Sequence, residues 1–327
     1  MRIIEPNVRY FNQYYTNNKV DKDTIENCLW EHIARCTRIC YQSTPRNKET
    51  DREFVIRTIM RGDICNRDFE HMHLAMLEHG TVYLRITNAE GYVYEMKDKY
   101  IRNNYSKVVV KVYDDDLSNR GIPFEEAFIT TNLRVIIENK WLSDLKYICY
   151  PTSEHIKRYT FSFTTNIGVS REFNRHRVNS VAEESTRHCN YSKDKFDNQL
   201  TFVKPAWLNK SDIKTSVDCL ELEYSFDYSS GFVVGQETYN WGAIEWYLYH
   251  LYMTEVTYNE LCSFGWSAQQ AREVLCLANK TELVHTAFED DWKHFINLRC
   301  KGVSGAPHPN AKIVAKQLEV LLKDINK

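Results

Sequence analysis

The chain has 327 residues, of which 42 are Lys or Arg and 44 are Asp or Glu, so its formal net charge is −2. This balance argues against a general nucleic-acid binder, because such proteins draw most of their affinity from a strong positive charge. No apolar run approaches the roughly 20 residues that a membrane span needs, and the start of the chain lacks the apolar stretch of a secretory signal. We therefore expect neither a nucleic-acid nor a membrane partner.

The ten cysteines are scattered and include no Cys-x-x-Cys pair. Cys36 and Cys40 are four residues apart and could form half of a zinc site, but no second pair completes it. Three histidines and Glu78 gather between residues 71 and 79, without the spacing of a His-Glu-x-x-His helix. We expect reduced, mostly buried thiols, no metal site and a cytoplasmic location.

The first half of the chain mixes helical and alternating patterns. Ile25, Leu29 and Ile33 have helical spacing, with Asp23 or Thr24 as the cap. The segment 88–122 is polar and carries one β-like run. The expected elements are a strand and a loop within 1–20, helices at 23–36 and about 51–61, strands at 81–86 and 107–113, and a helix around 124–139.

The second half begins with a cleanly alternating strand at 158–164 and then becomes mainly helical. A capping box over 267–270 opens the helix that holds Arg272, and Asp290 or Asp291 is expected to cap a later helix. The other expected elements are helices at about 210–226 and 238–264, a strand at 282–288, and an amphipathic helix after Pro309. We predict one α/β (α+β) domain over 1–327, with helices flanking a mostly antiparallel sheet and an insertion at about 88–150.

A dense group of charges lies between Arg171 and His188, where every cation is Arg or His. Arginine binds phosphate or carboxylate through two parallel hydrogen bonds, so this composition favours a pocket for a phosphorylated ligand. If 171–177 is helical, Arg171 and Arg175 share one face. The alternative is an ion-pair network on a surface helix, since structural networks also gather charges.

The order of the residues in this segment favours a pocket for a phosphorylated ligand. Arg175, His176 and Arg177 are followed, after seven residues, by Ser185, with Glu183 and Arg187 around it. This pattern resembles the signature of the flavin-dependent thymidylate synthases (the ThyX family). The resemblance implies the fold of the thymidylate synthase complementing proteins and reductive methylation of dUMP to dTMP. It also implies FAD as hydride carrier, NADPH and 5,10-methylenetetrahydrofolate as co-substrates, and a homotetramer with active sites shared between subunits.

Further positions match the same family. His73 and the pair Glu78-His79 precede a strand, Arg272 precedes a Val-Leu pair, and Arg299 ends an Asn-Leu-Arg element. By resemblance, Arg299 is the catalytic cation, which stabilises charge on the uracil ring. The implied substrate-binding residues are Glu172, Arg175, Glu183, Ser185, Arg187, Arg272 and Arg299. The implied cofactor-binding residues are His73, Arg175, His176, Arg177, Glu183 and His294, with Cys40 and Ala75 as weaker matches.

Some positions depart from the family pattern. Glu172 stands where many relatives have Gln, which affects the expected uracil contact. Phe288 and Asp290 replace an Asn and an Arg that help to bind flavin, His294 replaces an Asn, and His188 replaces a Tyr. Flavin affinity is therefore expected to differ from that of relatives.

Rival interpretations remain. Ser185 has no hydrolase elbow around it and Cys189 lies among flavin-family motifs, so neither is expected to be a nucleophile. A catalytically idle nucleotide-binding or RNA-binding protein could use the same arginines with stacking aromatics. A structural oligomer could use the Arg/Glu cluster as an interface.

Overall fold

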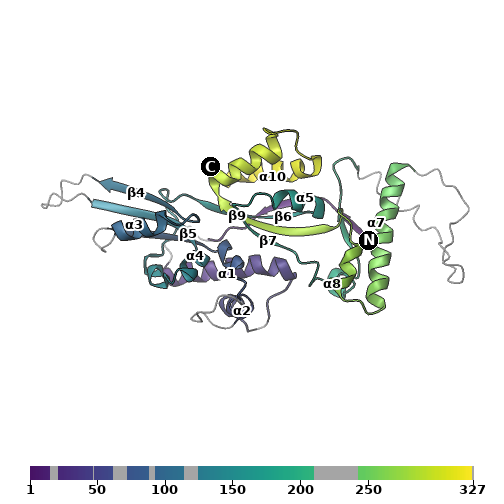
Figure 1. The fold of residues 1–327 in the computed structure, drawn as a ribbon, viewed down its shortest axis with the longest axis horizontal. Coiled ribbons are helices and arrows are strands. Elements are labelled where there is room, and N and C mark those ends of the chain that lie inside the picture. The colour runs from purple at the N-terminus through teal and green to yellow at the C-terminus, as the bar shows by residue number, and fades with distance from the viewer. Residues whose placement is uncertain are drawn as a thin grey trace, which may run out of the picture. The chain divides into compact units, whose positions relative to one another are not determined.

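The computed structural model describes residues 1–14, 21–46, 48–61, 72–87, 93–113, 124–209 and 242–325. The chain divides into two compact units (Figure 1). Unit 1 comprises Met1–Pro6, Thr165–Arg171 and Ser185–Thr281, and unit 2 comprises Asn7–Thr164, Glu172–Glu184 and Glu282–Lys327. The expected helix at 210–226 lies outside the described residues. The arrangement as one domain with an insertion stays a prediction.

Unit 1 combines a small parallel sheet with helices. Strand β1 (Arg2–Ile4) pairs in parallel with β8 (Thr201–Val203). The expected helix at 238–264 is found as α7 (Ala243–Ser263), which buries Leu248, Leu251 and Tyr258. Other helical elements among the described residues of unit 1 include η5 (Asp194–Phe196), α8 (Ala268–Ala271) and η6 (Arg272–Val274).

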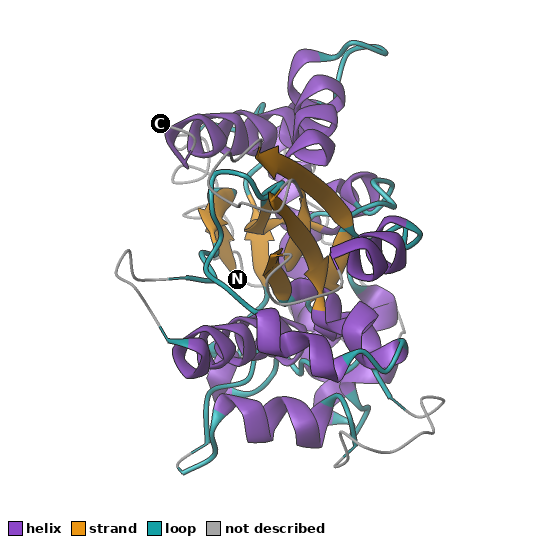
Figure 2. Ribbon diagram, turned by 90° about the vertical axis from the view of Figure 1, so that its left-hand side faces the viewer, coloured by secondary structure: helices purple, strands orange, loops and turns teal. Residues whose placement is uncertain are grey.

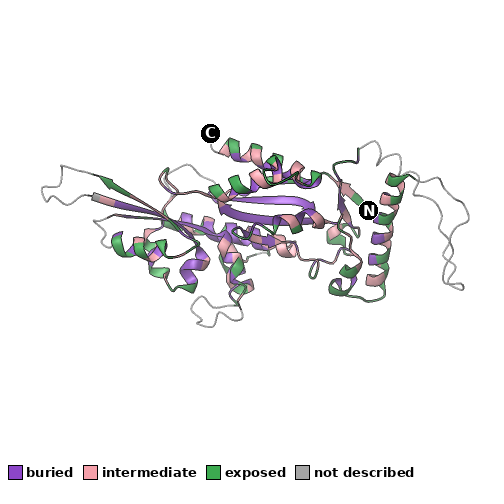
Figure 3. Cartoon of the chain, turned by 45° about the horizontal axis from the view of Figure 1, so that its top comes forward, coloured by how far each residue is buried: buried purple, intermediate pink, exposed green. Residues whose placement is uncertain are grey.

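The larger of the two sheets with strands in unit 2 has the order β2-β6-β9-β7. The pairs β2-β6 and β7-β9 are antiparallel. Its strands are β2 (Asn7–Tyr10), β6 (Arg158–Asn166), β7 (Ser180–Glu183) and β9 (Lys280–Phe288). The two long strands β6 and β9 are mostly buried and are purple along most of their length in Figure 3. The strands expected at 158–164 and 282–288 are thereby confirmed.

The second sheet has the order β3-β5-β4 and is fully antiparallel. Its strands are β3 (Thr81–Thr87), β4 (Lys107–Tyr113) and β5 (Phe124–Asn132). The helix expected around 124–139 is therefore wrong over most of its length, and only α4 (Leu133–Glu138) is helical. β5 is the central strand, and residues 126–132 are all buried, so it lacks the alternation that marks a half-exposed strand. Helix α3 (Val93–Ile101) lies in the segment that looked polar.

Helices α1 (Lys22–Tyr41) and α2 (Asp51–Thr58) confirm the two expected N-terminal helices. The cap of α1 is Asp21, whose carboxylate accepts from the Thr24 N–H at 2.8 Å, so the expected cap at Asp23 or Thr24 is wrong. Short helix η2 (Leu74–His79) follows, and Gly80 lets it approach α1 closely. A Cβ at Gly80 would lie 2.5 Å from Ile33 Cδ1.

The other helical elements of unit 2 are η4 (Leu142–Tyr147), α9 (Glu289–Ile296), a π-helix η7 (Asn297–Lys301) and α10 (Pro309–Ile325). The N-cap of α9 is Phe288, so the expected cap at Asp290 or Asp291 is wrong; both carboxylates lie in the first turn instead, where they complement the helix dipole. Helix α5 (Ile167–Phe173) joins β6 to the arginine-rich segment.

The fold is a mixture of helices and mostly antiparallel sheet, as predicted; Figure 2 distinguishes the two by colour. Within the described part of the chain, no helix is both long and apolar enough to cross a membrane.

Candidate active site

Arg299 is held in place by two partners that precede it in the chain by more than a hundred residues. Its Nη1 donates to Glu172 Oε2 at 2.8 Å and its Nη2 to the Glu172 carbonyl oxygen at 2.7 Å. Its Nε donates to His176 Nε2 at 3.2 Å. Each guanidinium nitrogen is thus engaged, so its plane is fixed before any ligand arrives.

His176 is the buried member of this group, which we call the Arg299 cluster (Glu172, His176, His294 and Arg299). The centroid of its ring lies 4.5 Å from that of the Phe295 ring and 6.0 Å from that of the His294 ring. His294 is exposed. Burial, followed by the charge of Arg299, lowers the pKa of His176 to about 4. His176 is therefore neutral at pH 7, and its Nε2 accepts a hydrogen bond from Arg299 Nε.

The C-terminal end of helix α5 lies at this cluster. In a continuing α-helix, the Glu172 carbonyl would accept from the N–H of His176. Here the Glu172 carbonyl accepts from the Arg175 N–H at 3.3 Å and from Arg299 Nη2, while the His176 N–H donates to Phe173 O at 3.0 Å. The expectation that 171–177 is helical, with Arg171 and Arg175 on one face, is therefore wrong beyond Phe173.

Arg175 and Arg177 lie in the turn after the helix and are exposed. Neither side chain makes a hydrogen bond or ion pair in the described part of the chain. Asn174, between Phe173 and Arg175, donates to Glu183 Oε2 at 2.9 Å and links this turn to β7. Two free guanidinium groups beside a fixed turn are the donor set that a phosphate or pyrophosphate needs.

A cavity of about 430 Å³, which we call the His73 cavity, lies beside η2. Its lining includes Cys40, Tyr41, Met72, His73, Ala75 and Met76. It therefore brings His73 together with Cys40 and Ala75, the weaker flavin-side matches. Cys40 also lies beside Glu183, and burial raises the pKa of its thiol to about 11.

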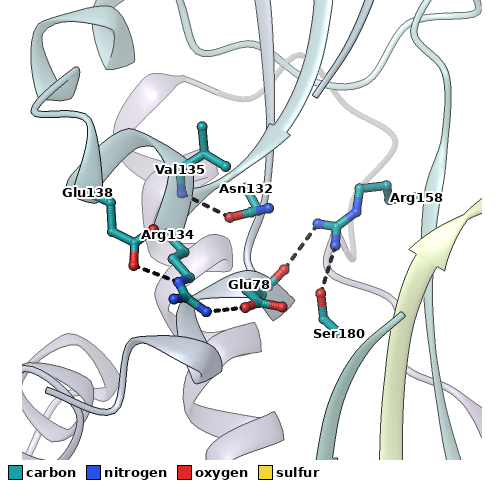
Figure 4. Close-up of polar contacts among 7 residues, drawn as sticks. All are labelled: Glu78, Asn132, Arg134, Val135, Glu138, Arg158 and Ser180. Atoms are coloured by element: carbon teal, nitrogen blue, oxygen red, sulfur yellow. Dashed lines mark hydrogen bonds and ion pairs between the residues drawn. The ribbon is translucent and has the colours of Figure 1, made fainter. Parts of the chain in front are cut away.

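Arg134 and Glu138 form the ionic rim of the His73 cavity and were missed in the sequence. Arg134 Nη1 lies 2.5 Å from Glu78 Oε1, and its Nε lies 2.8 Å from Glu138 Oε1 (Figure 4). The i, i+4 spacing of Arg134 and Glu138 on a helix indicated that they pair with each other, but it gave no indication of a cavity. Thioether and aromatic walls with a charged rim fit a flat heterocycle that carries polar edges, which is what a flavin ring requires.

Unit 1 holds the remaining expected residues. Ser185 starts a turn in which its carbonyl accepts from the N–H groups of His188 and Cys189. Arg187 is exposed, and its Nε donates to Gln269 Oε1 at 2.7 Å. Gln269 belongs to α8, three residues before Arg272, so Arg187 contacts the short helix that ends at Arg272.

Comparison with known families gives a match over most of this region. The model of a family described as thymidylate synthase complementing protein matches residues 146–325, which is more than half of the chain. The chain belongs to this family. The match includes every expected site residue except His73 and the weaker positions Cys40 and Ala75, which the sequence pattern alone assigns.

The solved structures that this member of the thymidylate synthase complementing proteins matches have low sequence identity and low TM-scores. A UMP/dUMP methylase PolB from Streptomyces cacaoi bound with 5-Br dUMP has 16% identity and a TM-score of 0.35, over 67% of this chain and 90% of that one. Thymidylate Synthase X from Helicobacter pylori with FAD and dUMP has 17% identity and a TM-score of 0.31, over 49% and 65%. No curated protein matches the chain.

Proposed function

We propose that the chain is a flavin-dependent thymidylate synthase, which methylates dUMP to dTMP. The observation that supports this most is the Arg299 cluster, because it lies within the family match and presents a fixed cation beside a neutral histidine. Such a cation can stabilise the negative charge that develops on a pyrimidine ring when its C5 is activated. The methylene carbon would come from 5,10-methylenetetrahydrofolate, which leaves as tetrahydrofolate.

FAD would supply hydride transfer in this reaction, and NADPH would restore its reduced form. Arg175, Arg177 and His176 are the residues that we propose to hold it, together with Glu183 and His294. This proposal is supported by the two unpaired guanidinium groups of the turn and by the His73 cavity, whose walls suit a flat ring. His73 would contact the ring from that cavity.

The substrate dUMP would be held mainly through its phosphate. Arg187 and Arg272 are the proposed phosphate ligands, and Ser185 a neighbouring hydrogen-bond donor. Both arginines are exposed or half-exposed, and Arg187 is oriented by Gln269 rather than neutralised by a carboxylate. Glu183 and Arg175 complete the proposed substrate contacts, and Glu172, which the sequence pattern also assigned to the substrate, acts through Arg299 by holding it in place. We also propose a homotetramer with shared active sites.

The test is dTMP formation, measured by chromatography, from purified protein with dUMP, 5,10-methylenetetrahydrofolate and NADPH, with and without FAD. Product that requires FAD is the expected result. Retained flavin without product would contradict the full reaction and support a binding protein that uses the same arginines. Neither product nor flavin binding would overturn the proposal.

A further inference from the structure

A second cavity of unit 2 carries features that the proposed reaction does not use. It has a volume of about 390 Å³ and shares no lining residue with the His73 cavity. We call it the Lys157 cavity. Phenol rings dominate its wall, and they are those of Tyr10, Tyr14, Tyr83, Tyr150 and Tyr159. Such walls suit a flat ring, because aromatic faces bury large areas at low conformational cost.

Two adjacent cations, Lys157 and Arg158, line the same cavity. Among the described residues, neither has a carboxylate within ion-pair distance. Lys157 Nζ donates to the Thr152 carbonyl and lies 5.9 Å from the centroid of the Tyr83 ring. Burial lowers its pKa from the usual lysine value.

Burial of the charged side chain costs more free energy for Arg158 than for Lys157. Arg158 Nη1 donates to Glu78 O at 3.1 Å and Thr81 Oγ1 at 3.2 Å, and its Nη2 to Ser180 Oγ at 3.2 Å. Its Nε is buried and has no partner. The carboxylates of Glu78 and Asp291 favour the charged form of Arg158 from a distance. Figure 4 shows that the Glu78 carboxylate pairs with Arg134, whereas Arg158 donates only to the Glu78 backbone oxygen.

Burial of positive charge without a counter-charge is unfavourable, and proteins normally compensate it by an ion pair or a bound ion. Two neighbouring cations that have no carboxylate within ion-pair distance among the described residues, in a cavity walled by tyrosines, therefore favour an anionic ligand over a neutral one. Tyr83 strengthens this requirement, because its oxygen accepts from the Arg158 N–H at 3.2 Å and leaves its own proton for a ligand.

We propose that the Lys157 cavity is a binding site for a small planar aromatic anion, whose ring packs among the tyrosines and whose phosphate or carboxylate binds Lys157 and Arg158. The site is distinct from the one proposed for methyl transfer, and it does not depend on that function. Its ligand could be a nucleotide-like phosphate or an aromatic carboxylate, which present the same ring-plus-anion chemistry.

The probe is pyridoxal 5′-phosphate, a planar aromatic phosphate with an aldehyde. In this probe the phosphate would bind Arg158, and the Lys157 amine would attack the aldehyde carbon to form an imine and release water. Borohydride would then add a hydride to give a stable secondary amine. Mass spectrometry of the peptides measures the labelling rate at each lysine. The matched control is Lys146, which is exposed and lies 4.8 Å from the centroid of the Tyr147 ring.

We expect Lys157 to be labelled at least about tenfold faster than Lys146, the factor that one charge-assisted hydrogen bond to phosphate can supply. Arg158→Met should remove this preference while circular dichroism stays unchanged. If that variant does not fold, Tyr150→Ala, which removes a half-buried ring of the wall, replaces it. Protection of Lys157 by dTMP would identify a phosphate ligand, and protection by 4-aminobenzoate a carboxylate. Equal labelling of Lys157 and Lys146, or a preference that survives both variants, would overturn the proposal.

Discussion

Arg299 and Arg175 belong to the same expected site but stand in opposite situations. Arg299 donates from every nitrogen to Glu172 or His176, and its side chain is only 20% exposed. Arg175 and its neighbour Arg177 are exposed and have no partner in the described part of the chain. A fixed cation cannot move toward an incoming group, whereas a free one can adapt to it.

This difference assigns different tasks to the two regions. Fixed dipoles and charges cost no reorganisation when charge develops in a transition state, so the Arg299 cluster suits catalysis. Free guanidinium groups gain most of their hydrogen bonds from the ligand, so the turn at 175–177 suits capture of phosphates. The following predictions separate the two regions, from the largest expected effect to the smallest.

Low pH should lower the free energy of unfolding mainly through the buried histidines of unit 2. Burial lowers the pKa of five histidines of unit 2 to about 3 or 4: His32, His79, His155, His176 and His285. In the unfolded chain they titrate near 6.5, so between about pH 4 and 6.5 the unfolded state binds more protons and the native state loses stability as pH falls. Each histidine contributes up to about 1.4 kcal/mol per pH unit in that window.

Thermal unfolding between pH 7.5 and 5 measures this effect. The melting temperature should be flat above about pH 7 and fall steeply below about 6.5. The matched control is His176→Phe, which should reduce the slope by the share of one histidine. A melting temperature that stays constant down to pH 5 would show that these rings are not held neutral.

Replacing Arg299 by Met should remove the fixed cation and keep most of the side-chain volume. We expect kcat to fall by about 10²–10³, the usual effect of losing one preorganised electrostatic group. The Glu172 carboxylate also loses its ion pair, so some stability should be lost. Chromatographic dTMP assays with saturating dUMP measure kcat, and retained flavin shows that the variant is folded. An unchanged kcat would exclude Arg299 from the chemistry.

Arg175→Ala should leave stability nearly unchanged, within about 0.5 kcal/mol, because the side chain has no partner to lose. Ligand affinity should fall by about 10- to 100-fold, as expected for a lost charge-assisted hydrogen bond to phosphate. Equilibrium titration of FAD and of dUMP measures which ligand depends on it. Arg171→Ala is the control, since Arg171 is also exposed and outside the Arg-His-Arg run. A lower melting temperature without an affinity change would instead favour a structural role.

The sequence predicted the elements with strong local patterns and failed where distant contacts decide. The strands at 81–86, 158–164 and 282–288 were predicted because their side chains have clear β-type spacing. The central strand β5 was taken for a helix, since pairing on both sides buries it continuously. Helix α5 ends at Phe173, and the Glu172 carbonyl there also accepts from Arg299, 127 residues after Glu172, a contact that no local pattern reveals.

The same limit applies to the candidate site. The Arg-His-Arg motif indicated both the position of the site and the family. The Asn-Leu-Arg motif indicated Arg299 as a site residue. The sequence did not show that Arg299 is already paired, because Glu172 was expected to bind the substrate and not to pair with an arginine so distant in the chain. Nor did it identify Arg134, whose role depends on the position of Glu78 in space.

Glu172→Gln gives the smallest change and tests the pairing itself. Glutamine keeps the shape, so Arg299 Nη2 should remain bound to the backbone oxygen and Nη1 to the amide oxygen, while the negative charge is lost. The net positive charge beside the proposed pyrimidine then increases, and we expect dUMP affinity to rise by less than about tenfold, as for a half-exposed ion pair worth about 1 kcal/mol. Titration of dUMP at two salt concentrations measures this, with Glu95→Gln, at an exposed position outside the proposed site, as the control. Weaker dUMP binding would mean that the carboxylate itself contacts the substrate, and Glu172 would then be a ligand rather than a clamp on Arg299.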